Sequence, residues 1–434
     1  MDPVLIGLIG LVVLFVLLLI GMPIGVCFLA VGFFGIAALP GSGWKPAFGT
    51  MTIEMWGIAF EYQLIVIPLF ILMGNFANIG GLGRDLYDAA YSWIGQFRGG
   101  LASTTIVAQA GFAALSGSSL ASAVTMGRVA LPEMKRYNYH DRLATGCVAA
   151  GGTLGFLIPP SAGMVVYAYL TEQNIAQLFL AGVIPGILLA FLFVVAIAIV
   201  TKINPELGPP GDTSEARRWQ TLWRAKTIIG VILITIGGMY FGFFTPVEAA
   251  GVGALLTFFV TLARRQINLA KTKSIILQTV RTTSTLFLIL IGARVFSPFM
   301  ARTGVPELLV DFLLGIDVGT VAILAILLVT YMILGTFMEG FSMLVLTLPV
   351  VLPVLIELEV SLIWFGVASV IVIEMGLISP PLGINVFVVK GLVPDVPLGT
   401  IFAGIWPFWI AMAVGIAILL AFPQLALFLP ETML

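Results

Sequence analysis

The sequence predicts an all-α polytopic membrane protein made of two inverted repeats, each with a re-entrant helical hairpin and a broken transmembrane helix. Of its 434 residues, 60% are hydrophobic and 9% are charged, and the mean hydropathy is +1.13. Apolar runs of about 20 residues, long enough for a helix to cross a bilayer, recur along the chain. Motifs rich in Gly, Pro and Ser recur at a separation of half its length. The composition therefore indicates a bundle in lipid, and the recurrence indicates a duplicated unit.

The distribution of Lys and Arg orients the predicted helices, because these residues stay on the cytoplasmic side of short loops. Basic residues cluster in 202–226 and in 264–281, so both stretches are expected inside. The apolar residues between them, 227–263, then form two scaffold helices that go out and return. Residues 4–39 form the scaffold helices of the first half. Extended along the chain, this scheme places the N-terminus outside and 16 of the 20 Lys and Arg residues inside.

Two apolar segments have both ends on one side of the membrane and are predicted to be re-entrant hairpins. Segment 101–131 has Arg and Lys on both flanks and SGSS at 116–119, where Gly and hydroxyl residues favour a turn. Segment 319–353 has acidic flanks and MEGFS at 338–342, which fits a base on the outside. The two tips are expected at membrane depth, entering from opposite faces.

Each hairpin is followed by an apolar stretch that a Pro pair interrupts. GFLIPPSAG lies within 143–171, and GLISPPLGIN lies within 362–389. Pro lacks a backbone donor and clashes with the preceding turn, so each helix is expected to break at its Pro pair. The sequence therefore predicts two broken transmembrane helices.

The two halves align at a shift of 221 to 224 residues, which predicts a first repeat over 1–222 and a second over 223–434. The first repeat starts outside and the second inside, so they are expected to be inverted copies. That arrangement lets one site face either side of the membrane in secondary transporters. The aligned positions are Pro23 with Pro246, Gly80 with Gly304, Gly117 with Gly340, and Pro159-Pro160 with Pro380-Pro381.

Broken backbone at membrane depth offers free carbonyl oxygens. Hydroxyls beside them complete the oxygen cage that a hard cation such as Na⁺ prefers. One Na⁺ site is predicted where the first hairpin meets the first break, and a second at the equivalent place in the other half. The predicted ligands of the first site are Ser116, Ser118, Ser119, Gly155, Ile158 and Pro160, and those of the second are Gly340, Ser342, Gly376, Ser379 and Pro381.

A small carboxylate substrate is predicted to bind in the same region. Half-helix N-termini at the tips and breaks direct free N–H groups into the cavity, so an anion can bind without a dedicated Arg. Ser119, Ser161 and Asn385 are the candidate substrate contacts. For one SGSS motif alone, close helix packing would be the simpler explanation, but its repetition beside a second broken helix favours ligation.

Ionisable residues within apolar segments are functional candidates, because a charge is expensive in hydrocarbon; the alternative is a structural ion pair. We expect Arg128 to snorkel, Cys27 and Cys147 to be buried, and His140 to lie in a solvated loop. The sequence contains neither a phosphate loop nor an HExxH metal motif, and the net charge of −1 gives no indication of nucleic-acid binding. The ionisable candidates are Glu248, Arg294, Glu339 and Glu374.

Several motifs resemble those of a known family, the large membrane subunit of tripartite ATP-independent periplasmic (TRAP) transporters. The similarity extends over essentially the whole chain. One departure is Asn138-Tyr139, where the family usually has Gly-Tyr, in a loop outside the predicted site. The similar stretches are SGSSLASAVTMGRVALPEMKRY, GGTLGFLIPPS, FFTPVEAAGVG and EMGLISPPLGINVFVV.

The resemblance implies a transporter rather than an enzyme. It implies a multi-pass protein of the bacterial inner membrane that imports an organic acid with two or more Na⁺ ions per cycle, through an elevator motion. It also implies two partners, a periplasmic substrate-binding protein and a small four-helix membrane subunit. Because the chain begins at the large subunit's first helix, that small subunit is expected to be a separate chain. A C4-dicarboxylate, a 2-oxo acid and a sugar acid such as sialic acid all fit the predicted site.

Three other kinds of membrane protein could share this composition. A Na⁺/dicarboxylate symporter of similar architecture would work without a binding protein; the motif match favours the TRAP family over it. A channel would need rings of identical charge or a filter repeated by subunit symmetry, and the sequence has neither. An intramembrane enzyme is disfavoured because the chain has one His and no paired Asp motif.

Overall fold

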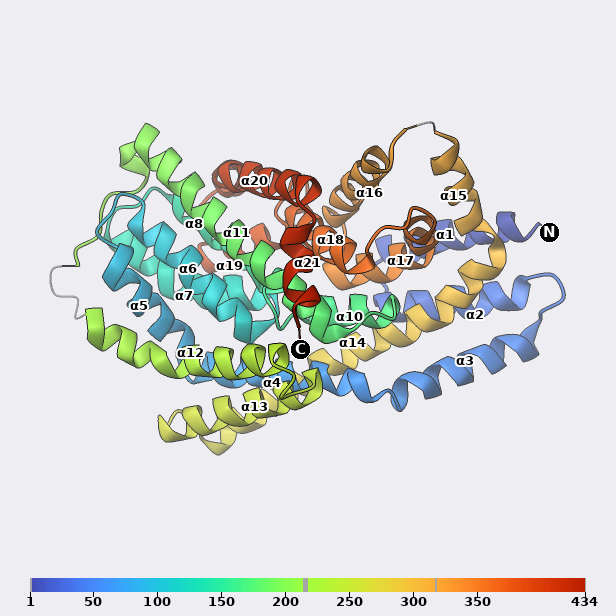
Figure 1. Cartoon of the computed structure of the whole chain (residues 1–434), viewed down its shortest axis with the longest axis horizontal. Helices are drawn as coiled ribbons and strands as arrows, with labels where there is room; N and C mark the ends of the chain where they lie inside the picture. The colour runs from blue at the N-terminus through green and yellow to red at the C-terminus, as the bar shows by residue number, and fades with distance from the viewer. Residues whose placement is uncertain (1, 214–217, 317, 434) are drawn as a thin grey trace.

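The computed structural model describes residues 2–213, 218–316 and 318–433, and within these ranges it contains helices and no strands. Seven of the described helices are long and apolar enough to cross a membrane, or up to eight if a bent pair counts as one span. The prediction of an all-α polytopic protein is confirmed. Figure 1 shows the helices arranged in one elongated bundle.

The first half of the chain supplies the elements from α1 to α11. Their bounds are α1 Pro3–Leu19, α2 Ile24–Ala38, α3 Trp44–Ala59, η1 Tyr62–Ile65, α4 Val66–Ile79, α5 Leu82–Ile94, α6 Gly100–Ser116, α7 Ser119–Arg136, α8 Asp141–Gly152, α9 Leu154–Leu157, α10 Ala162–Leu170 and α11 Ile175–Ile203. A short 3-10 helix, η2 Pro205–Leu207, follows α11, and the remaining helices come after it. Their bounds are α12 Arg218–Tyr240, α13 Pro246–Ala263, α14 Leu269–Thr303, α15 Val305–Gly315, α16 Thr320–Gly335, α17 Gly340–Glu357, α18 Leu362–Leu377, α19 Ile384–Leu392, α20 Leu398–Ala421 and α21 Gln424–Glu431.

The order of helices in the first half recurs in the second. Helices from the two halves also exchange partners: α2 packs on α14 while α13 packs on α4, and α7 packs on α19 while α17 packs on α10. Such reciprocal pairing is what two copies related by a two-fold axis produce. In Figure 1 the first hairpin (α6 and α7) and the second (α16 and α17) lie toward opposite ends of the bundle. The opposite orientation of the two halves in the membrane stays a prediction.

Helices of the first half approach helices of the second half closely, because Gly residues lie where they cross. A side chain on Gly25 of α2 would collide with the Leu288 backbone of α14, and one on Gly292 would collide with the Gly25 carbonyl. In the same way, Gly146 of α8 faces Gly404 of α20. Small residues at such contacts let backbones pack without side chains between them, which is how helices associate in lipid.

The predicted hairpins and breaks coincide with helix boundaries, whereas the start of the second scaffold pair does not. Segment 101–131 covers most of α6 and α7, and 319–353 covers α16 and most of α17. Segment 143–171 is broken after Leu157, and its two parts are bent by 42°. The scaffold helix expected from residue 227 begins instead at Arg218, so the expected boundary at 222/223 falls inside α12.

The early start of α12 has a local cause. The Arg218 side chain donates one hydrogen bond to the Ser92 carbonyl oxygen at 3.1 Å and another to the Gln96 amide oxygen at 3.1 Å. Thr221 Oγ1 lies 2.9 Å from Ser92 Oγ. The basic stretch expected as a loop is therefore held as helix against α5.

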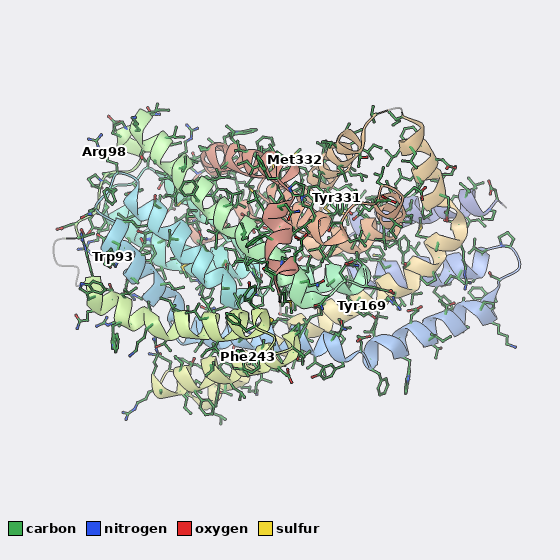
Figure 2. All side chains as sticks on the ribbon, viewed as in Figure 1. Trp93, Arg98, Tyr169, Phe243, Tyr331 and Met332 are labelled. Carbon is green, nitrogen blue, oxygen red and sulfur yellow. The ribbon has the colours of Figure 1, made fainter. Side chains whose placement is uncertain are left out.

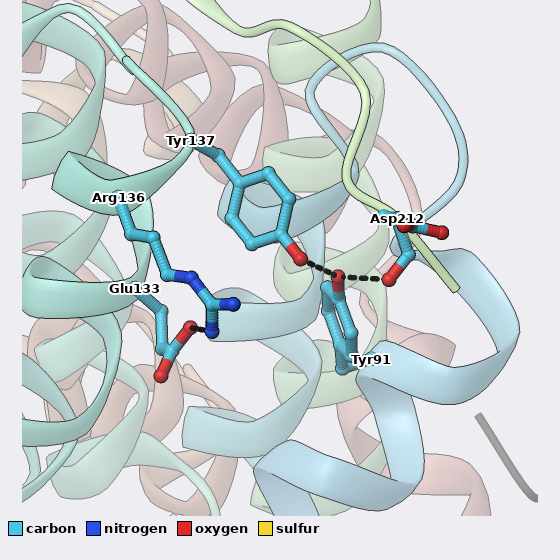
Figure 3. Close-up of polar contacts among 5 residues, drawn as sticks. All are labelled: Tyr91, Glu133, Arg136, Tyr137 and Asp212. Atoms are coloured by element: carbon cyan, nitrogen blue, oxygen red, sulfur yellow. Dashed lines mark hydrogen bonds and ion pairs between the residues drawn. The ribbon is translucent and has the colours of Figure 1, made fainter. Parts of the chain in front are cut away.

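The segment that follows α11 lies across the base of the first hairpin. The Gly208 and Leu207 carbonyl oxygens accept hydrogen bonds from the N–H groups of Gly99 and His140, at 2.8 Å and 3.2 Å. The Tyr91 hydroxyl donates to the Asp212 carbonyl oxygen at 2.7 Å and lies 3.0 Å from the Tyr137 hydroxyl (Figure 3). We call residues 204–213 the strap, because they connect the α5–α6 corner to the α7–α8 corner.

Candidate cation and substrate site

The turn of the first hairpin packs directly on the first break. Gly117 forms the turn with φ +59°, a conformation that Gly adopts without strain. A β-carbon at Gly117 would lie 2.7 Å from the Pro160 carbonyl oxygen. The Ala162 N–H donates to the Gly117 carbonyl oxygen at 3.5 Å. The hairpin tip and the break therefore share one contact surface.

Hydroxyl groups of the first hairpin line this contact. A β-carbon at Gly155 would lie 2.6 Å from the Ser118 carbonyl oxygen and 2.8 Å from Ser122 Oγ. Ser116 Oγ lies 2.8 Å from Ser122 Oγ. The structure thus brings together Ser116, Ser118 and Gly155 of the predicted first cation site, with Pro160 at its edge. Ser122 was not predicted, although it follows Ser118, the N-cap residue of α7, by one helical turn.

The Pro pair leaves carbonyl groups of α9 without their usual donors. Pro159 and Pro160 cannot donate to the carbonyls four residues earlier, those of Gly155 and Phe156. The Ser161 hydroxyl donates to the Phe156 oxygen at 2.6 Å, which satisfies that carbonyl. The Gly155 carbonyl receives no such donor from Pro159, so it is one acceptor that this break makes available. Ile158, also predicted, packs its side chain against Gly186 of α11.

The second predicted cation site is assembled differently. A β-carbon at Gly340 would lie 3.0 Å from the Phe156 ring and 3.3 Å from Ile373 Cγ2. The tip of the second hairpin therefore packs against α9, at the first break, and against α18, which precedes the second break. Ser342 is fully buried, and its Oγ has no hydrogen-bond partner. Gly376 packs instead on the end of α16, where a β-carbon would lie 2.7 Å from the Met332 carbonyl oxygen.

Ser379 and Pro381 do not join Gly340 and Ser342 at the tip. The Ser379 hydroxyl donates to the Met375 carbonyl oxygen at 2.6 Å and accepts from Trp409 Nε1 of α20 at 3.1 Å. Pro381 is exposed, whereas Pro160 in the first half is buried. The second site is thus less complete than the first in this structure.

The three predicted substrate contacts are all buried, but their side chains differ in how many hydrogen bonds they already make within the protein. The Ser161 hydroxyl donates to Phe156 and caps α10 by accepting from the Met164 N–H at 3.4 Å, so it has a local structural role. Asn385 at the start of α19 has neither amide atom hydrogen-bonded. An unpartnered buried amide costs about 1–3 kcal/mol per group. Asn385 therefore remains the better candidate for a ligand contact.

Two of the ionisable candidates have structural partners. Glu248 forms a capping box with Thr245 at the start of α13: its carboxylate accepts from the Thr245 N–H at 2.8 Å. Arg294 of α14 donates to the carboxylate of Glu54 at 2.9 Å. Glu339 precedes α17, and Glu374 is buried in α18 with neither carboxylate oxygen hydrogen-bonded.

The remaining residues singled out in the sequence lie outside the site. Cys27 and Cys147 are free and fully buried, as predicted. Arg128 is exposed on α7. His140 is exposed and caps α8 through its Nδ1 atom, which accepts from the Arg142 N–H at 3.1 Å.

A cavity of about 640 Å³ opens between α10, α13 and α14. Its lining includes Glu61, Tyr169, Glu172, Thr245 and Arg294. Figure 2 shows Tyr169 near the middle of the molecule, where α10 meets α14. Under the predicted orientation these residues lie toward the outside, where an incoming solute would enter.

Residues 11–425 match the family described as the tripartite ATP-independent periplasmic transporter, DctM component. The chain belongs to this family. TRAP transporter permeases are transporters rather than enzymes, which confirms the prediction from the motifs. The chain is therefore a multi-pass membrane permease subunit.

Curated relatives carry several substrate names. The C4-dicarboxylate TRAP transporter large permease protein DctM of Pseudomonas aeruginosa is 34% identical, over 88% of this chain and 89% of its own length. The sialic acid TRAP transporter large permease protein SiaM of Vibrio cholerae is 31% identical, over 96% and 97%. The isethionate TRAP transporter permease protein DctMQ of Oleidesulfovibrio alaskensis is 30% identical, over 86% of this chain and 59% of its own length.

A solved structure shares the fold. The YdaH transporter of Alcanivorax borkumensis superposes with a TM-score of 0.65 at 14% identity, covering 92% of this chain and 97% of that chain. At this identity the likeness concerns the fold alone. The helical architecture of the permease thus occurs in a transporter of very different sequence.

Proposed function

We propose that this permease is the large subunit of a Na⁺-coupled importer of an organic acid. The observation that carries the proposal is the contact between the first hairpin turn and the first break, where Gly117 meets Pro160 and Gly155 meets Ser118. Hydroxyl and carbonyl oxygens gather there, and these are the ligands that a hard cation takes. The equivalent place in the second half, near Gly340 and Ser342, is proposed as a second Na⁺ site.

The substrate is a small carboxylate or related anion. The relatives named for C4-dicarboxylates, sialic acid and isethionate all handle compact organic anions, which supports this class. The half-helices α10 and α19 begin at the breaks, and helix N-termini favour negative charge. The unpartnered amide of Asn385 supplies a donor beside one of these N-termini.

The permease works in the inner membrane with two partners, a periplasmic binding protein and a small membrane subunit on a separate chain. Transport follows an elevator motion, in which hairpins and broken helices move together against α1, α2, α12 and α13. Physical support comes from the packing: the hairpins contact the broken helices, and the Gly-lined crossing of α2 and α14 belongs to the scaffold side.

The decisive experiment is uptake of radiolabelled succinate, sialic acid or isethionate by proteoliposomes containing the permease and its small subunit. An imposed inward Na⁺ gradient should drive uptake of one of these anions, and only with the cognate binding protein outside. Uptake that is equal under Na⁺ and choline gradients would refute Na⁺ coupling. Uptake without the binding protein would identify the alternative, a symporter that works alone.

The elevator motion has its own test. A pair of Cys residues at Tyr169 and Arg294 joins the broken helix α10 to α14, the helix that packs on the scaffold helix α2. Cross-linking this pair should stop transport, and reduction should restore it. A cross-linked permease that still transports at the normal rate would show that α10 and α14 do not move apart during the cycle.

A further inference from the structure

Glu374 is a buried carboxylate with no visible partner. It lies within α18, its exposed fraction is 1%, and neither of its oxygens accepts a hydrogen bond. Burying an uncompensated charge is among the most expensive events in a protein interior, and in a membrane span it is expected only with a compensating function. An unsatisfied buried group of this kind points to a bound ion or water.

The surroundings of Glu374 come from both hairpins. The Ser119 hydroxyl, at the start of α7, stands beside the carboxylate without completing a hydrogen bond. Glu339, which immediately precedes α17, is close enough to interact with it electrostatically. The neighbouring residue Ile373 touches Gly340 at the second tip. The Glu374 carboxylate therefore lies where the two hairpin tips approach each other.

Neither Glu374 nor Glu339 forms an ion pair with a Lys or Arg side chain among the described residues. In the part of the chain that the structure describes, the ion pairs join Arg136 to Glu133, Arg264 to Asp85 and Arg294 to Glu54. None of them includes Glu374 or Glu339. Two carboxylates that interact in a weakly polar interior repel each other, so a mobile cation between them would be held strongly.

The two halves differ at these positions. The shift of 223 residues pairs Glu339 with Ser116, and the shift of 221 residues pairs Glu374 with Thr153. The Thr153 hydroxyl donates to the Ala150 carbonyl oxygen at 2.5 Å, as an ordinary helix residue does. The first half is thus neutral where the second half carries two carboxylates. Ser116 is a predicted ligand of the first Na⁺ site but Thr153 is not, so Glu374 has no counterpart among the ligands of the duplicated pair.

We propose that Glu374, with Ser119 from the first hairpin and Glu339 from the second, binds one further Na⁺ ion between the hairpin tips. Carboxylate and hydroxyl oxygens suit a hard cation. Because Ser119 and Glu339 belong to different hairpins, a bound ion would hold the two tips together. The inference rests on the proposed Na⁺ coupling and adds an anionic site to it.

The test is a thermal titration of the purified full-length permease in detergent. The melting temperature is measured against NaCl, with choline chloride keeping the ionic strength constant, for the wild type, Glu374→Gln and Glu248→Gln. The wild type should be stabilised by Na⁺ in a saturable way. The half-saturating Na⁺ concentration of Glu374→Gln should rise at least about tenfold, a loss of about 1.4 kcal/mol of binding. Glu248→Gln changes an exposed capping residue and should keep the wild-type midpoint.

Glu374→Asp covers the case in which Glu374→Gln does not fold, because it keeps the charge and withdraws the oxygens by one methylene. It should also raise the half-saturating Na⁺ concentration. If both variants titrate like the wild type while Ser118→Ala loses the response, the Glu374 site is wrong and Na⁺ coupling stands. If the wild type itself does not respond to Na⁺, Na⁺ coupling and this site are both wrong. Stabilisation on acidification in place of Na⁺, abolished in Glu374→Gln, would overturn the assignment to Na⁺ in favour of a proton.

Discussion

The guanidinium carbon of Arg294 lies 5.6 Å from the centre of the Tyr169 ring, so a cation on α14 rests on an aromatic side chain of the broken helix α10. The same Arg294 donates to the Glu54 carboxylate of α3 at 2.9 Å. One side chain of α14 thus contacts both α3 and the broken helix α10 at the edge of the 640 Å³ cavity. Any movement of α10 along α14 must separate the ring from the charge.

The Arg294–Glu54 pair should contribute modestly to stability, because both side chains are partly exposed, at 37% and 19%. In a double-mutant cycle of Arg294→Gln and Glu54→Gln, we expect a coupling energy of about 0.5–1 kcal/mol. The measurement is the free energy of unfolding of the four proteins in detergent. A coupling energy of zero would mean that Arg294 is held by Tyr169 alone. The variant Tyr169→Leu should weaken the cation–π contact and leave the ion pair intact.

Gly117→Ala should damage the first cation site specifically. The left-handed conformation costs a non-Gly residue about 1–2 kcal/mol. The added methyl group would also press on the Pro160 carbonyl oxygen and push the tip away from the break. We expect a lower melting temperature and a higher half-saturating Na⁺ concentration. Gly57→Ala is the matched control, because Gly57 lies in α3 with open space around it. This substitution should increase the free energy of unfolding by up to about 1 kcal/mol. Equal behaviour of the two variants would contradict the tip contact.

Gly404→Ala should destabilise the crossing of α8 and α20. The new methyl group would collide with the Arg142 carbonyl oxygen, and overpacking of this kind costs about 1–3 kcal/mol. The nearby hydrogen bond from Arg142 Nε to the Ala403 carbonyl oxygen, at 3.0 Å, should be lost as the helices separate. Gly399→Ala, at the start of the same helix, meets no atom and should be neutral. Melting temperatures of the two variants check the difference.

Tyr91→Phe should loosen the strap from the base of the first hairpin. It removes the hydrogen bond to the Asp212 carbonyl oxygen, worth about 1 kcal/mol. Burial raises the pKa of Tyr91, so the folded state keeps the proton at a pH where the unfolded chain releases it. Stability from this group is therefore complete below a pH of about 10 and falls above it. Tyr91→Phe should be less stable than the wild type at neutral pH, and the gap should narrow in alkali. If the difference in stability between Tyr91→Phe and the wild type grew with pH, the pKa of Tyr91 would not be raised in the folded state.

Cysteine labelling tests the orientation of the hairpins. Both native Cys residues are fully buried, so a membrane-impermeant maleimide should give little background. Single Cys residues at Arg98 and Lys135, on either side of the first hairpin, should label only from the cytoplasmic side. Gly319→Cys and Glu359→Cys, which flank the second, should label only from outside. Labelling of Arg98→Cys and Lys135→Cys from different sides would show that 101–131 crosses the membrane. The predictions of a re-entrant hairpin and of the ion sites would then both be wrong.

Local chemistry explains what could be predicted from the sequence about this permease. The helix breaks follow from Pro pairs, the turn at Gly117 from a Gly among hydroxyl residues, and membrane insertion from apolar runs of spanning length. The family followed from motifs that each occupy one continuous stretch. These features depend on neighbours along the chain, so a linear pattern is enough to find them.

Contacts between distant segments were decided only by the tertiary structure. Nothing near Arg218 in the sequence indicates that its hydrogen bonds to α5 extend α12, and nothing near Ser379 indicates that Trp409, 30 residues away, occupies its hydroxyl. The sequence marked Glu374 and Arg294 equally, as charges in apolar helices. The fold gives Arg294 a partner in Glu54, 240 residues away, and leaves Glu374 without one, because partners are set by packing in three dimensions rather than by spacing along the chain.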